Sequence, residues 1–313
     1  MRFELTILGS SSALPTSERN LTAHVLNVYE RFFLIDCGEG TQMQLRRTRI
    51  KFGRINHIFI SHIHGDHIYG LFGLLSSLNL LDRSEDLHIY AHEPLRKGIR
   101  YIIRNYEGKF NYAIRFHPLD EEQQQKIYED LRVEVYSFPL KHKIPSAGFL
   151  FLEKPRELNI RAGYVKKYDI PVSKIHEIKN GADYRTQQGE HIPNHRLTEP
   201  PYKQRSYAFC SDTAYWEDIV PYIQGADLLY HEATFADEHK DQAEYTLHST
   251  AREAGRIARK AEVAKLIIGH FSARYKEEQI TALVNEAREE FGETLPAHDG
   301  MVYSIEPYRR DHH

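Results

Sequence analysis

Hydrophobic and polar positions along this 313-residue chain recur with two different periods, which predicts strands and helices in succession. Short runs rich in β-branched and aromatic residues are typical of strands. They cover residues 3–8, 22–29, 31–35, 55–60, 87–91, 131–138 and 264–268, and a final strand is expected over 296–305. Helices are expected up to Arg47 and over 68–81, 94–105 and 276–291. This alternation favours a layered α/β architecture.

Two of the helices carry more specific signals. In 68–81 the leucines at 71, 74, 75 and 78 share one helical face, so this helix is expected to pack on a sheet. Thr250 and Glu253 have the spacing of a capping box, which predicts a helix that begins there. His248 then lies directly before a helix, on a fixed backbone.

The pattern weakens between residues 153 and 205, where five prolines and little periodicity suggest an insertion. The segment contains eleven lysine and arginine residues against seven acids, so it is locally basic. A solvated surface loop and a surface that contacts an anionic partner are both compatible with this composition. Residues 1–152 and 206–308 are expected to form one domain around the insertion, and 309–313 an exposed tail.

Composition limits which partners and which compartment are expected. The formal charge of −3 gives no overall sign of an anionic partner, so any nucleic-acid surface has to be a local patch. One candidate is the run of cations from Arg46 to Arg54, which equally suits the solvated end of a helix. No apolar run reaches about 18 residues, so no membrane span is expected. Cys37 and Cys210, the only cysteines, fit free thiols in a reducing cytoplasm.

The strongest chemical signal follows the strand over 55–60. The segment Ser61-His62-Ile63-His64-Gly65-Asp66-His67 places three histidines and one aspartate within six positions, and Gly65 permits a tight turn. Imidazole and carboxylate together suit zinc and its neighbours better than magnesium or calcium. A polar loop with core histidines is disfavoured, because burying this many unpaired polar rings is costly. The segment therefore predicts a metal site.

This H-x-H-x-D-H pattern resembles the metallo-β-lactamase superfamily, whose loop binds two metals. The resemblance implies an αβ/βα four-layer sandwich and further ligands after later strands. His142, Asp212 and His270 each follow an apolar run in the expected order. By analogy His62, His64 and His142 bind one zinc ion, Asp66, His67 and His270 bind the other, and Asp212 bridges them.

Other motifs resemble one family within that superfamily. They are the polar loop over 9–20, D-C-G-E-G-T-Q over 36–42, Tyr230 to Phe235 and Leu247 to Thr250, and together they are similar to ribonuclease Z, the tRNA 3′-processing endoribonuclease. The resemblance implies that Asp66 acts on the attacking water. It also implies that His248, paired with Glu232, donates a proton to the leaving oxygen.

The resemblance further implies a zinc endoribonuclease, with two Zn²⁺ per subunit, that cleaves the 3′ trailer from precursor tRNA and leaves a 3′-hydroxyl. Residues 153–205 then correspond to a protruding tRNA-binding arm, or exosite, of a cytoplasmic homodimer. Candidate substrate-binding residues are Arg19, Asn20, Lys166 and Lys167. Two alternatives are another dinuclear-zinc hydrolase acting on a small phosphodiester or lactone, and a non-catalytic RNA-binding relative.

Overall fold

The computed structural model describes residues 2–201 and 203–307, so the expected tail 309–313 lies outside the described residues. Contacts divide the chain into two compact units. One is formed by the chain up to Leu152 together with Ser206–Ile305, and the other contains Glu153–Arg205. None of the helices in the described part of the chain is both long and apolar enough to cross a bilayer.

The larger unit is built on two seven-stranded sheets. The first has the order β20-β1-β3-β4-β5-β6-β7. Its strands are β1 (Phe3–Gly9), β3 (Ala23–Val28), β4 (Arg31–Ile35), β5 (Ile55–Phe59), β6 (Leu87–Ala91), β7 (Ile114–Pro118) and β20 (Val302–Ser304). The second has the order β19-β17-β16-β15-β10-β9-β8. Its strands are β8 (Gln125–Glu129), β9 (Val133–Leu140), β10 (Ser146–Glu153), β15 (Ser206–Cys210), β16 (Leu228–Glu232), β17 (Leu266–Gly269) and β19 (Thr294–Pro296). A short parallel pair, β2 (Ser11–Ser12) and β18 (Phe271–Ser272), joins two loops.

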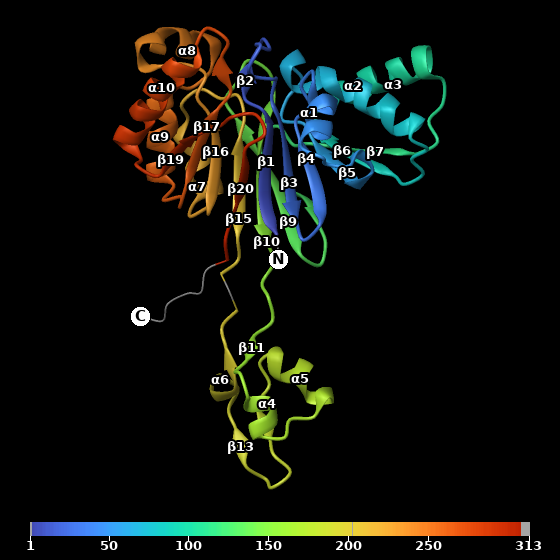
Figure 1. Cartoon of the computed structure of the whole chain (residues 1–313), viewed down its shortest axis with the longest axis vertical. Coiled ribbons are helices and arrows are strands. Elements are labelled where there is room, and N and C mark those ends of the chain that lie inside the picture. Colours follow the sequence, from blue (N-terminus) through green and yellow to red (C-terminus); the bar gives the residue numbers. More distant parts are fainter. Residues whose placement is uncertain (1, 202, 308–313) are drawn as a thin grey trace. The chain divides into compact units, whose positions relative to one another are not determined.

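Helices cover the outer faces of both sheets (Figure 1). Outside the first sheet lie α1 (Thr41–Arg47), the 3₁₀ turn η1 (Phe52–Arg54), α2 (Gly65–Leu80), α3 (Pro94–Ile102) and the π-helix η2 (Ile103–Glu107). The second sheet is accompanied by η3 (Glu217–Ile219), α7 (Val220–Ile223), η4 (Asp237–His239), α8 (Lys240–Thr246), α9 (Ala251–Lys260) and α10 (Glu277–Glu290). The expected α/β sandwich is confirmed.

Alternation along the strands explains the layers. On β4 and β5, Phe33 and Phe59 face the second sheet, where the ring centroids of Phe59 and Phe149 lie 5.6 Å apart. Leu34 and Ile58 face the opposite way, into a separate cluster with the leucines of α2. Because strand side chains alternate between faces, one strand contributes to both cores.

Several sequence predictions need correction. The final strand expected over 296–305 exists but is shorter, because the chain leaves β19 at Pro296 and turns at Gly300, with φ +81°, before Val302–Ser304 form β20 in the other sheet. A run of strand-forming residues cannot reveal that the chain crosses between sheets. Strands β7, β8 and β10 were not expected; most side chains of β8 are exposed, so it lacks an apolar pattern.

The smaller unit has little regular structure. Its elements are β11 (Asn159–Ile160), α4 (Tyr164–Lys167), α5 (Val172–Lys179), β12 (Tyr184–Arg185), β13 (His191–Ile192), α6 (Asn194–Leu197) and β14 (Thr198–Glu199). Five buried residues form its own small core: Ile170, Ile178, Tyr184, Ile192 and Leu197. At its base the buried Arg205 guanidinium donates to both oxygens of the buried Glu153 carboxylate, at 3.0 and 3.2 Å.

Candidate active site

Parallel strands bring the predicted ligands together. In the first sheet β4, β5 and β6 are parallel, and in the second β15, β16 and β17 are parallel. The carboxyl ends of parallel strands meet at one edge of a sheet, where sites commonly form. His62 and His64 follow β5, whereas Asp212 and His270 follow β15 and β17. Asp66 and His67 lie in the first turn of α2, which begins earlier than the sequence indicated.

The first group of converging atoms surrounds one oxygen of Asp212. His62 Nε2 lies 3.0 Å from His64 Nδ1, and His142 Nε2 lies 3.3 Å from the same atom. Asp212 Oδ2 lies 3.4 Å from His62 Nε2 and 3.9 Å from His142 Nε2. These four side chains, drawn from three segments far apart in sequence, offer one ligand atom each.

The second group surrounds the other oxygen of Asp212. Oδ1 lies 3.3 Å from His67 Nε2 and 3.2 Å from His270 Nε2. Asp66 Oδ2 completes this group at 3.5 and 3.4 Å from the same two nitrogens. The two carboxylate oxygens of Asp212 therefore face different groups, which is the arrangement of a bridging ligand.

These distances fit a divalent metal in each group. Ligands about 2.0–2.1 Å from a tetrahedral zinc ion lie about 3.3 Å from one another, close to the observed separations. The donor set of imidazole and carboxylate suits transition metals. Burial lowers the pKa of His62 to about 3, so its ring stays in the neutral form that binds metal.

In four of the five ligand histidines, the ring nitrogen that does not face the ligand groups contacts another polar group. His67 Nδ1 lies 2.8 Å from Asp36 Oδ2, and His62 Nδ1 lies 3.1 Å from Ser61 Oγ. His142 Nδ1 donates to the carbonyl oxygen of Leu247 at 2.8 Å, and His270 Nδ1 lies 2.9 Å from Thr234 Oγ1. Such contacts orient metal-binding imidazoles and fix their tautomers.

Asp36 is a residue of this site that the sequence reasoning missed. Its fully buried carboxylate accepts hydrogen bonds from the backbone N–H and the hydroxyl of Ser61, at 2.8 and 2.9 Å, besides contacting His67. Its position at the end of β4, opening D-C-G-E-G-T-Q, was the available signal. Asp36 and His270 both have left-handed backbones, with φ of 56° and 59°. Such strained conformations cluster at functional sites.

His248 and Glu232 form a pair beside the second group. His248 Nδ1 lies 2.8 Å from Glu232 Oε1, and Thr234 Oγ1 donates to the other carboxylate oxygen at 2.7 Å. Burial lowers the pKa of His248, but the carboxylates of Glu232, Asp212 and Asp66 together outweigh it and raise the pKa to about 9. The expected capping box of Thr250 and Glu253 is confirmed, and it fixes the start of α9 just after His248.

The first loop bears two of the residues proposed to contact substrate. Arg19 is buried, and its guanidinium donates to the carbonyl oxygen of Tyr275 at 2.6 Å. Asn20 contacts Asp299 through both its backbone N–H and its side chain, at 2.7 and 2.9 Å. Both contacts fix the loop, whereas substrate contact by these residues stays a prediction. Loop residue Ala13 also donates its N–H to Asp66 Oδ2 at 2.8 Å.

Known proteins are similar to this chain over nearly its whole length. A protein named Ribonuclease Z from Bacteroides thetaiotaomicron is 49% identical over 98% of this chain and 96% of its own length. Another from Parabacteroides distasonis is 46% identical over 97% of this chain and 99% of its own. The chain belongs to the ribonuclease Z family. A family model described as Anti-Pycsar protein Apyc1 also matches residues 3–162.

Solved structures agree with the ribonuclease Z assignment. The human tRNase Z, short form (ELAC1), is 30% identical and superposes with a TM-score of 0.70, covering 97% of this chain and 99% of that one. The metallo-beta-lactamase fold protein YhfI from Bacillus subtilis has a TM-score of 0.69, covers 97% of this chain and 100% of that chain, and is 16% identical. At that identity it shows only that the fold is shared.

Proposed function

We propose that this protein is a metal-dependent endoribonuclease that removes the 3′ trailer from precursor tRNA by phosphodiester hydrolysis and leaves a 3′-hydroxyl. One observation carries the proposal. The two ligand groups that share Asp212, with the His248–Glu232 pair beside them, lie in a chain that is 49% identical to a Ribonuclease Z. The non-catalytic alternative is disfavoured, because every expected ligand converges on this site.

The proposed cofactor is a pair of zinc ions in each subunit. His62, His64 and His142 would bind one ion, Asp66, His67 and His270 the other, and Asp212 both. When bound, two such ions stabilise charge on the phosphoryl oxygens and make water nucleophilic at neutral pH. The remaining chemistry falls to side chains of this chain.

Asp66 and His248 are the proposed proton carriers. Asp66 orients the attacking water or takes its proton, because its carboxylate lies at the second ligand group and is fixed by the Ala13 N–H. His248 is protonated at neutral pH because Glu232, with Asp212 and Asp66, raises its pKa to about 9 against the opposing effect of burial. Since Nδ1 contacts Glu232, the proton at Nε2 is the one given to the leaving ribose oxygen.

The smaller unit, residues 153–205, is the proposed tRNA-binding arm. Lys166 and Lys167 lie exposed on α4, and Lys167 Nζ lies about 5.0 Å from the Tyr164 ring and 4.9 Å from the Tyr168 ring. The unit has its own core, so it can present cations to a phosphate backbone without altering the metal site. We further propose that the enzyme is a cytoplasmic homodimer in which each arm serves the partner's site, and that Arg19 and Asn20 border the substrate.

Replacing residues 160–195 by a short Gly-Ser linker tests the arm. Cleavage of precursor tRNA is expected to collapse through weaker binding, while a small phosphodiester, which needs only the metal site, is still hydrolysed. A milder variant, Lys166→Gln with Lys167→Gln, should flatten the salt dependence of tRNA affinity. The matched control is Lys126→Gln, an exposed lysine of β8.

Two outcomes would contradict these proposals separately. Normal precursor processing by the linker variant refutes the arm's role and leaves the reaction intact. An unmodified enzyme that opens lactones or small phosphodiesters but ignores precursor tRNA refutes the reaction itself.

A further inference from the structure

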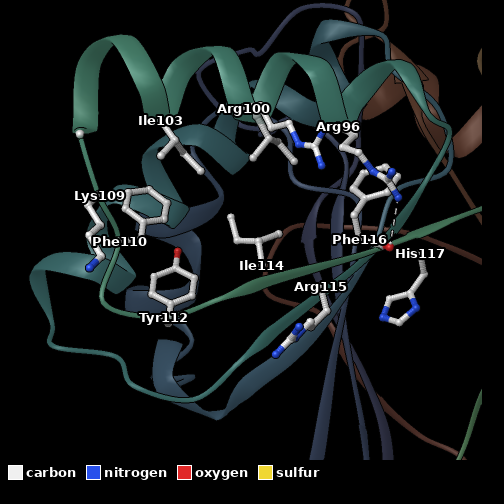
Figure 2. A pocket seen from close by; sticks show the side chains of 12 residues that line it. Arg96, Arg100, Ile103, Lys109, Phe110, Tyr112, Ile114, Arg115, Phe116 and His117 are labelled. Carbon is white, nitrogen blue, oxygen red and sulfur yellow. Dashed lines mark hydrogen bonds between the residues drawn. The ribbon is translucent and has the colours of Figure 1, made fainter.

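A cavity lies away from the metal ligands, between the helix α3 with its π-helical extension η2 and the edge strand β7 (Figure 2). Its volume is about 540 Å³, within the range of roughly 300–1,000 Å³ typical of small-molecule sites. Strand β7 is two strands from β5, so it is about 10 Å to the side of the strand that leads to His62. The ribonuclease chemistry described above does not use this cavity.

The interior of the cavity is apolar and partly aromatic. Ile99 and Ile103 line it from the helix, and Phe110, Ile114 and Phe116 line it from β7 and the segment before it. Figure 2 shows Ile103 pointing down from the helix toward Ile114, with Phe110 and Phe116 at either end of the space. Such a surface suits a flat, apolar group.

Cations surround this apolar interior. Arg96 and Arg115 already have acidic partners, Glu93 at 3.4 Å and Asp86 at 2.7 Å. Arg100 and Lys109 also line the cavity and are exposed, but neither forms an ion pair with any described residue. Two uncompensated cations beside an apolar cavity complement a ligand that has an anionic group on a flat body.

The backbone beside the cavity contains an uncommon helical turn. Ile103 begins a π-helix, which ends before Gly108 with φ +78°. π-Helical turns are rare and frequently occur at functional sites. The nearest acid in sequence, Glu107, accepts a hydrogen bond from Ser76 of α2 at 3.1 Å and forms no ion pair with Lys109 among the described residues. The local geometry thus leaves the charge of Lys109 available to a ligand.

We propose that the cavity between α3 and β7 binds a nucleoside phosphate, with the base on the apolar surface and the phosphate at the cationic rim, to which Arg100 and Lys109 contribute from different sides. Arginine and lysine both bind phosphate, and aromatic and apolar side chains accept any base by stacking. The ligand is either a free nucleotide or one nucleotide of a single-stranded RNA. Both ligands present the same base and phosphate to the cavity. A longer RNA is expected to bind more tightly than a mononucleotide if RNA is the natural ligand.

Equilibrium binding of adenosine 5′-monophosphate to the metal-loaded protein tests this proposal. Saturable binding is expected, at least tenfold tighter than that of adenosine or of inorganic phosphate alone. Arg100→Gln with Lys109→Gln should weaken it tenfold or more. The control Lys97→Gln removes an exposed cation of the same helix that does not line the cavity, and it should change affinity less than twofold. A tetranucleotide that binds tenfold tighter than the mononucleotide identifies RNA as the source, and equal affinity identifies the free nucleotide.

A second variant and a competition assay distinguish binding in this cavity from binding at the metal site. Ile103→Trp keeps every charge but fills the cavity, so it should also weaken binding tenfold. Unchanged affinity in Ile103→Trp, or in the double variant, overturns the proposal. It is also overturned if adenosine 5′-monophosphate inhibits hydrolysis of a small phosphodiester with an inhibition constant equal to its Kd, because the ligand then occupies the metal site. None of these outcomes depends on whether precursor tRNA is the substrate.

Discussion

Asp36→Asn should weaken metal binding although Asp36 is not itself a ligand. The aspartate accepts hydrogen bonds at both oxygens, and Oδ2 lies 2.8 Å from His67 Nδ1. An asparagine of the same shape can still accept from the Ser61 N–H with its oxygen. Its amide then points N–H groups at the position that receives the His67 N–H. The new amide N–H group and the N–H at His67 Nδ1 would then face each other, which is unfavourable. To avoid this, His67 has to move its proton to Nε2, the atom that would bind the metal.

The expected magnitude follows from known effects of removing such partners. Loss of one orienting contact typically lowers metal affinity by about 10–100-fold, which is about 1.4–2.8 kcal/mol. Chelator competition followed by elemental analysis measures it, with circular dichroism to establish that the variant is folded. Asp120→Asn is the matched control, because Asp120 is exposed and accepts hydrogen bonds from two backbone N–H groups of its own turn. Unchanged affinity in Asp36→Asn would refute this account of His67.

Three further predictions concern the reaction. Asp212→Ala should lose much of the bound metal by elemental analysis, whereas His57→Ala, at a histidine of β5 that stacks on His88 and belongs to neither ligand group, changes little; two tightly bound equivalents in Asp212→Ala would contradict the bridge. Asp66→Ala should lower single-turnover rate far more than tRNA affinity, because the loss falls on the transition state, and equal losses would assign Asp66 a structural role. His248→Ala should slow RNA cleavage by about 10²–10⁴-fold but barely affect an activated nitrophenyl phosphodiester, whose leaving group needs no proton; similar losses on both would place His248 in folding.

The metal loop was readable from sequence because its ligands are contiguous and follow an apolar strand. His142, Asp212 and His270 were then expected at later strand ends. The parallel strands β15, β16 and β17 bring Asp212 and His270 to one edge of the second sheet, and His142, which follows β9 of the same sheet, joins Asp212 in the first ligand group. The end of each apolar run can be read directly from the sequence, so residues at strand ends can be named. The order of the strands in the sheet cannot be read in this way.

Other features depend on contacts that sequence does not reveal. Asp36 contacts His67 only because β4 and β5 are neighbours and α2 begins at Gly65. Arg19 was named as a substrate-binding residue from the resemblance, and its residue type does not reveal that the backbone carbonyl groups of Ser272 and Tyr275 accept hydrogen bonds from its buried guanidinium. The cavity under α3 required strand β7, which no apolar alternation had indicated.

The most direct test of the central claim is cleavage of a precursor tRNA by the purified, metal-loaded protein, with both product ends mapped. The account predicts one endonucleolytic cut that releases the trailer intact and leaves a 3′-hydroxyl on the tRNA, with this activity lost in Asp66→Ala. Stepwise shortening of the trailer, a 3′-phosphate product, or equal activity in Asp66→Ala would contradict it.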